Sequence, residues 1–106
     1  MEKNGAAVIL PKITLIKAVT ANGEEVKELV FREPTGADIE RVGNPVSVDF
    51  AQDPPKIRYE RSMSAMIAAL AEIPPSTVKQ MNARDWENAA LVITNFFLPD
   101  LSRISS

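Results

Sequence analysis

The chain of 106 residues contains neither cysteine nor histidine. Without cysteine it cannot form the disulfides that hold many small secreted domains together, so the composition favours a reducing compartment. It also lacks thiolate and imidazole chemistry, and with them the ligands of most zinc and copper sites. We therefore expect a cytosolic protein that holds no metal and no cofactor.

Long apolar runs and a strong charge excess are missing as well. The apolar stretch at residues 6–10 is too short to span a membrane and makes a poor signal peptide. The net charge of −2, with both signs mixed along the chain, gives no basic face for nucleic acid. The composition is that of a soluble domain, which we place at residues 13–98, between a flexible N-terminal tail (1–12) and a C-terminal tail (99–106).

Motifs for catalysis and for metal binding are weak. Ser76 and Lys79 match the S-x-x-K pattern of penicillin-recognising enzymes, but the S-D-N and K-T-G elements are absent. Asp49 and Asp53 supply too few oxygens for a calcium loop. We interpret Ser76 as part of a helix start and Lys79 as a solvated lysine; acylation of Ser76 is the enzymatic alternative.

Two further residue classes carry no chemistry of their own. Glu24, Glu25 and Glu28 are expected to be solubilising glutamates on an exposed hairpin rather than an acid–base pair. The four glycines form no G-x-G phosphate loop. Function therefore most readily means binding, and we predict no enzymatic activity.

The strongest local signal is Asn22-Gly23, which lies between two segments rich in β-branched residues, 13–20 and 25–32. Asn-Gly supplies the positive φ angles of a tight turn, so the sequence predicts a β-hairpin. A lone two-stranded ribbon is marginal in water and must pack on helices or pair with another chain. Its unpaired edges also allow homo-oligomers to form strand to strand.

A capped helix follows the hairpin. Pro34 ends the second strand because it has no N–H for the ladder. Thr35 is a good N-cap, and Asp38, three residues later, completes a capping box. The helix is expected to stop at Gly43-Asn44-Pro45.

Residues 44–55 show no clean period. We expect a surface loop with Phe50 tucked inwards, although weak alternation at Val46 and Val48 leaves an added extended piece as the alternative. Asp53-Pro54 is expected to open the next helix as N-cap and first-turn proline.

Two helices and a short turn fill the C-terminal half. The first helix shows a helical stripe formed by Tyr59, Met63, Met66, Ile67 and Leu70. We interpret Met63 and Met66 as core residues. The alternative is that they form an adaptable binding groove together with Met81. Ile73-Pro74-Pro75 ends this helix, and residues 76–81 form one or two further turns.

Asn82 is predicted to cap the last helix, with Asp85 three residues on. Trp86 is interpreted as the core anchor of its main stripe, whereas Leu91 and Leu98 project from a different side. Such a helix is either sandwiched in the fold or keeps one side for a partner. We predict that Leu91 and Leu98 bind a partner, together with an unpaired hairpin edge.

The elements together predict an α+β fold, an N-terminal β-hairpin packed against a small C-terminal helical unit of three to four short helices. In their order they resemble the tail assembly chaperones of Mu-like and related contractile-tailed phages and prophages. The resemblance covers Ile13 to Leu98. Its segments are the strand-to-helix junction at residues 30–38, the Ile-Pro turn at 69–78, the helix start at 81–86 and the aromatic end at 94–98. Residues 44–57 depart from the family pattern, being longer and richer in proline.

The resemblance implies a non-catalytic chaperone in the cytoplasm of a bacterial host. It would bind the tape measure protein, keep that long helical chain soluble and recruit tail tube subunits. The alternative is a small structural subunit, a tail or head-completion protein, that stays in the virion.

Overall fold

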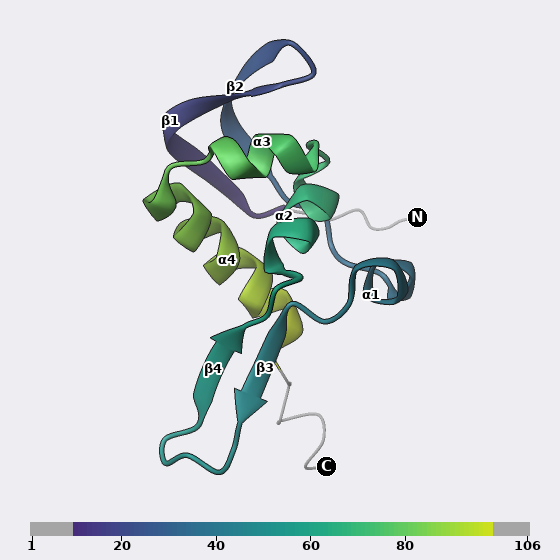
Figure 1. The fold of residues 1–106 in the computed structure, drawn as a ribbon, viewed down its shortest axis with the longest axis vertical. Coiled ribbons are helices and arrows are strands. Elements are labelled where there is room, and N and C mark those ends of the chain that lie inside the picture. The colour runs from purple at the N-terminus through teal and green to yellow at the C-terminus, as the bar shows by residue number, and fades with distance from the viewer. Residues whose placement is uncertain (1–9, 99–106) are drawn as a thin grey trace, which may run out of the picture.

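Two antiparallel hairpins lie at opposite ends of the computed structural model, which describes residues 10–98, and helices occupy the space between and beside them (Figure 1). The first hairpin is formed by β1 (Lys12–Ala21) and β2 (Glu24–Val30), and the second by β3 (Val46–Asp49) and β4 (Lys56–Tyr59). The helices are α1 (Gly36–Val42), α2 (Met63–Ala71), α3 (Pro75–Gln80) and α4 (Ala83–Phe97). This confirms the α+β class. Of the two predicted tails, residues 1–9 and 99–106 lie outside the described residues.

The first hairpin turns where the sequence predicts. Asn22 and Gly23 have φ angles of 53° and 81°, and Ala21 pairs with Glu24 on either side of them. The register shifts between Thr14 and Val19, where β1 carries extra residues opposite β2. This irregularity leaves backbone groups of β1 without partners in the ladder, so they must be satisfied elsewhere.

Side chains of the helical unit close the outer edge of β1. The Asp85 carboxylate, which is fully buried, accepts hydrogen bonds from the N–H groups of Ile16 and Lys17. Nearer the turn, Thr20 donates its N–H to Gln80 at 3.1 Å, and its carbonyl accepts the Thr77 hydroxyl at 2.7 Å. The helices therefore take the place of a neighbouring strand along β1, and this fixes the hairpin on the helical unit.

The segment between α1 and α2 corrects four expectations. Val46 and Val48 pair with Tyr59 and Ile57 in a second hairpin, so the alternation marks strand rather than loop. Phe50 is 66% exposed in the connection between the strands, and is not tucked inwards.

Asp53-Pro54 does not open a helix either, because the chain continues into β4 and α2 begins only at Met63. Tyr59 therefore belongs to a strand rather than to the helical stripe. Pairing between strands decides these elements, and the weak alternation within one short segment is not enough to predict it.

α2 forms the centre of the core and contacts α1, α3, α4 and β2. Its large buried side chains, Met63, Met66, Ile67 and Leu70, were all predicted for the stripe, so the interpretation of the first two methionines as core is confirmed. β2 adds Leu29 to this core. Phe31, which comes directly after the end of β2, is fully buried as well. The core leaves one side of α4 uncovered.

Candidate partner-binding surface

The start of α4 fixes the orientation of the whole helix. The Asn82 side chain accepts a hydrogen bond from the Arg84 N–H at 2.9 Å, which confirms the predicted N-cap. Asp85 does not complete a capping box, because both its oxygens bond to β1 instead. The contact joins residues 69 positions apart in the chain, so the spacing of Asn82 and Asp85 does not predict it. As a result, α4 is held against the hairpin at its first turn.

Trp86 lies at the border between the core and the surface. It is half-buried against the core, and its indole N–H donates to the Ser64 hydroxyl of α2 at 2.9 Å. Its ring meets that of Tyr59 edge to face, with centroids 5.8 Å apart. The indole N–H thus has a partner within the protein, which leaves the exposed part of the ring as apolar surface.

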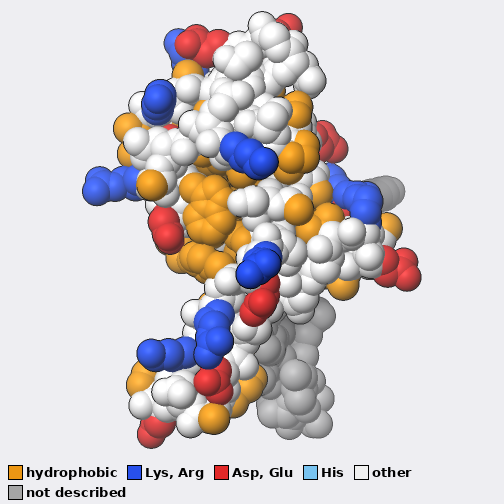
Figure 2. All heavy atoms as spheres, viewed as in Figure 1, with side chains coloured by type: hydrophobic (Ala, Val, Ile, Leu, Met, Phe, Trp, Pro, Cys, Tyr) orange, Lys and Arg blue, Asp and Glu red, His pale blue; other side chains and the backbone are white. Residues whose placement is uncertain are grey.

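A groove of about 330 Å³ opens beside Trp86, where α2, α3 and α4 meet. It is lined by Ser64, Val78, Lys79, Met81, Ala83, Trp86 and Glu87. Figure 2 shows hydrophobic side chains gathered in the middle of this face, with acidic and basic side chains around them. The groove therefore has an apolar floor and one charge of each sign in its lining, Lys79 and Glu87.

Leu91 and Leu98 continue this surface along α4. Residues at intervals of three, four or seven lie on the same side of a helix, so Leu91 follows Glu87 by one turn and Leu98 follows Leu91 by two. Both leucines are exposed, by 55% and 40%. We call the groove together with these two leucines the α4 surface. From Ala83 to Leu98 it extends about 22 Å, the rise of about four helical turns.

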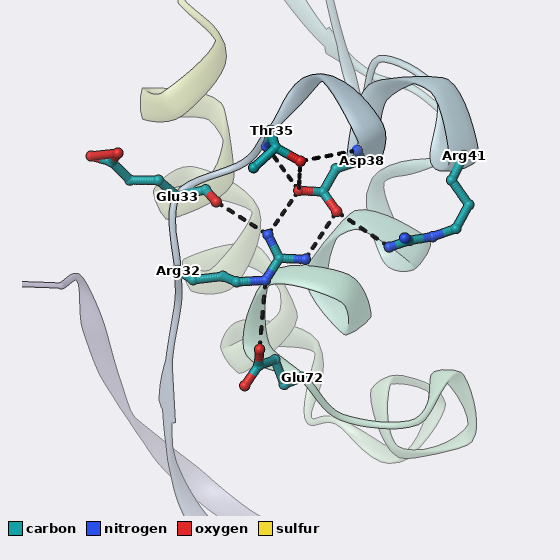
Figure 3. Close-up of polar contacts among 6 residues, drawn as sticks. All are labelled: Arg32, Glu33, Thr35, Asp38, Arg41 and Glu72. Carbon is teal, nitrogen blue, oxygen red and sulfur yellow. Dashed lines mark hydrogen bonds and ion pairs between the residues drawn. The ribbon is translucent and has the colours of Figure 1, made fainter.

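A second cluster of interest joins β2 to α1 (Figure 3). The Asp38 carboxylate is buried and receives two parallel hydrogen bonds from the Arg32 guanidinium, at 2.8 and 2.9 Å. It also accepts the Thr35 N–H at 2.8 Å, while the Thr35 hydroxyl accepts the Asp38 N–H. This confirms the predicted capping box. Arg41 and Glu72 add ion pairs at the rim.

The electrostatics of this cluster follow from those contacts. The hydrogen bonds from Arg32, followed by that from the Thr35 N–H, hold the pKa of the Asp38 carboxyl well below its usual range. Asp38 in turn raises the pKa of Arg32. Both groups therefore keep their charges and are bonded to each other, so the cluster stabilises the strand-to-helix junction and offers no group for proton transfer.

The structure places the residues of the S-x-x-K match on α3. Ser76 and Lys79 are both exposed, and of the two only Lys79 lines the groove. The carboxylate of Asp49 accepts hydrogen bonds from the Ala51 N–H and the Gln52 amide, within the turn of the second hairpin. Within residues 10–98, no three acidic side chains converge as a metal site would require.

The remaining predicted residues lie on exposed positions or at the groove. Glu24, Glu25 and Glu28 are exposed on β2, with Glu25 and Glu28 in ion pairs to lysines at 3.8 and 3.7 Å. Met81 lines the groove, the alternative that the sequence left open for this methionine. No helix in the described part of the chain is long and apolar enough to cross a membrane.

Sequence reasoning missed the groove itself. Its lining comes from three helices, and Lys79, Met81 and Trp86 were considered separately in the sequence rather than as neighbours on one surface. The aromatic side chain of Trp86 and the thioether side chain of Met81, both close to the start of α4, were the available signal.

Comparison with known families decides what kind of protein carries this surface. A family model described as "Phage tail assembly chaperone proteins, E, or 41 or 14" matches residues 12–98. The chain belongs to this family of phage tail assembly chaperones. No curated protein and no solved structure is significantly similar to this tail assembly chaperone. The matched range includes both hairpins and the entire α4 surface.

Proposed function

We propose that this tail assembly chaperone binds the tape measure protein in the cytoplasm of its bacterial host, without catalysis, and aids assembly of the tail tube around it. The family supports a role in tail assembly. The observation that carries the choice of partner is the α4 surface, a narrow strip about four helical turns long that has a groove at one end and two exposed leucines along it. A strip of this shape fits the apolar side of an amphipathic helix.

The composition of the α4 surface also suits a complex that must later come apart. Two exposed leucines and one half-buried tryptophan form a small apolar contact, far from the extent of an obligate interface. Lys79 and Glu87 favour a helix that carries both charges beside its apolar stripe. Modest affinity would let tube subunits displace the chaperone as they polymerise, and recruitment of those subunits is part of the proposal.

Substitution of the two leucines tests the surface. Leu91→Asp and Leu98→Asp should each weaken capture of purified tape measure fragments, because a carboxylate replaces apolar contact area. Phe50→Asp is the matched control, since it replaces another exposed apolar side chain by the same carboxylate outside α4, in the connection between β3 and β4. Capture by both leucine variants equal to that of the control, with all of them folded, would overturn the assignment of the surface.

A composition test separates this role from that of a structural subunit. A chaperone should be absent from purified virions, while a tail or head-completion protein would be present in stoichiometric amount. Mass spectrometry of particles from an infected or induced host distinguishes the two. Stoichiometric presence would contradict the chaperone proposal.

A further inference from the structure

The described part of the chain contains four strand edges that could pair with another strand, and they are not equivalent. Side chains from α3 and α4 occupy the edge of β1, as described above. The edge of β3 is partly closed, because Val46 is buried and its N–H donates to the Asn44 side chain at 3.0 Å. The Arg32 N–H, just beyond β2, donates to the Leu70 carbonyl of α2, so the outer edge of β2 is covered at that end. Among the described residues, the outer edge of β2 from Glu24 to Val30 and the outer edge of β4 are open.

Backbone groups on both open edges point away from their own hairpins. The Phe31 N–H donates to the Pro11 carbonyl, so by the alternation of an antiparallel ladder the backbone of Val30 points outwards. The Glu60 N–H donates to the Pro45 carbonyl, so the backbone of Glu60 points inwards. By the same alternation, the backbone of Ile57, three residues earlier, points outwards. Val30 and Ile57 are also the exposed large apolar residues of these two strands.

The two open edges carry opposite charge. β2 contains three glutamates and one lysine, all exposed. β4 contains Lys56 and Arg58, both exposed, and no acidic residue. Charges of one sign oppose pairing of β2 with another β2, and of β4 with another β4. Pairing of β2 with β4 brings the opposite charges together.

We infer that copies of this chain associate head to tail, the acidic β2 edge of one copy pairing with the basic β4 edge of the next. Backbone hydrogen bonds would supply affinity, and the charges would select which edges meet. Because the two edges lie on hairpins at opposite ends of the molecule, one copy can pair at both ends at once (Figure 1). Such heterologous contacts build a ring or an open array rather than a closed dimer. This inference is independent of the proposed partner of the α4 surface.

Sedimentation velocity of the full chain over a wide range of concentrations tests the inference. The wild-type protein should associate beyond a dimer, and association should weaken as salt is added. Glu24→Lys with Glu28→Lys, and separately Lys56→Glu with Arg58→Glu, should each weaken association by about tenfold or more, because repulsion replaces attraction. Glu33→Lys with Glu40→Lys is the control for the first pair, and Arg61→Glu with Arg84→Glu for the second, because each makes the same charge change at exposed positions outside both strands.

Mixing the two reversed proteins gives the sharpest result. One then has two basic edges and the other two acidic edges, so together they should associate again although neither does alone. Far-UV circular dichroism checks that each protein is folded. If the protein with Glu24→Lys and Glu28→Lys is not folded, Glu24→Gln with Glu28→Gln takes its place. A wild-type protein that stays monomeric, a reversal that leaves association unchanged, or a mixture that stays apart would overturn the inference.

Discussion

Asp85 accepts the backbone N–H of Ile16 on both carboxylate oxygens, at 2.9 and 3.0 Å, across 69 positions of the chain. One of these oxygens also accepts the Lys17 N–H at 3.1 Å. A single buried carboxylate in the first turn of α4 thus satisfies the N–H groups that the irregular stretch of β1 leaves unpaired. It ties the two parts of the α+β fold together.

Replacing Asp85 by asparagine should lower the free energy of unfolding by about 1–3 kcal/mol, the usual loss for a buried hydrogen bond to a charged group. The amide keeps one oxygen but turns an N–H₂ donor towards the N–H groups of β1. Urea denaturation measures the loss.

Hydrogen exchange separates this role of Asp85 from a helix effect. Asp85→Asn should speed exchange of the Ile16 and Lys17 amides in particular. Asn82→Ala removes only the cap of α4, with a cost of about 1 kcal/mol, and should leave those two amides protected relative to the rest of β1. Equal protection in both variants would show that the carboxylate does not hold the strand.

The ion pair between Arg32 and Asp38 predicts a pH dependence with a definite sign. The pKa of Asp38 is lowered in the folded protein, so its stabilising contribution is fully present above the unfolded value of about 3.9. It is lost as the pH falls through the lowered pKa of the folded state. The wild-type protein should therefore exceed Asp38→Asn in urea midpoint at pH 7, and the difference should shrink below about pH 4.

Glu40→Gln provides the control for this titration, because Glu40 is an exposed acidic residue of the same helix. Its urea midpoint should follow that of the wild type at every pH. A difference between wild type and Asp38→Asn that stays constant down to pH 3 would contradict the assigned role of the carboxylate.

Thr35→Ala should cost about 1 kcal/mol of stability, because the side-chain oxygen that accepts the Asp38 N–H is removed. Thr35→Ser keeps that oxygen and should cost far less. Thermal or urea unfolding of the three proteins gives the comparison. Equal losses for alanine and serine would mean that the methyl group, and not the cap, is responsible.

Signals confined to a few neighbouring residues allowed much of the fold to be predicted. Asn22-Gly23 determines a turn by itself, and Thr35 with Asp38 determines a helix start, because the interacting groups lie within three residues. The second hairpin was missed because its four-residue strands are stabilised by each other. Asp53-Pro54 has the chemistry of a helix start, yet pairing of the residues that follow it into β4 prevails.

The candidate site was less predictable than the fold. Periodicity along α4 separated Leu91 and Leu98 from the buried stripe, and the structure places both at the surface. The groove beside Trp86 depends on how three helices meet, and the role of Asp85 depends on a strand at the other end of the chain. Met81 and Trp86 give a local signal for the groove, whereas the role of Asp85 has none.

Trp86 is the only tryptophan of the chain and lines the groove, so its fluorescence reports directly on occupancy of the α4 surface. Titration of the chaperone with a helical tape measure fragment should shift Trp86 emission to shorter wavelength, in a saturable manner, as the partner excludes water from the indole. The shift should require more fragment in Leu91→Asp than in Phe50→Asp, which makes the same kind of change outside α4. Emission that does not change while the fragment is captured, or equal titrations for the two variants, would contradict the account.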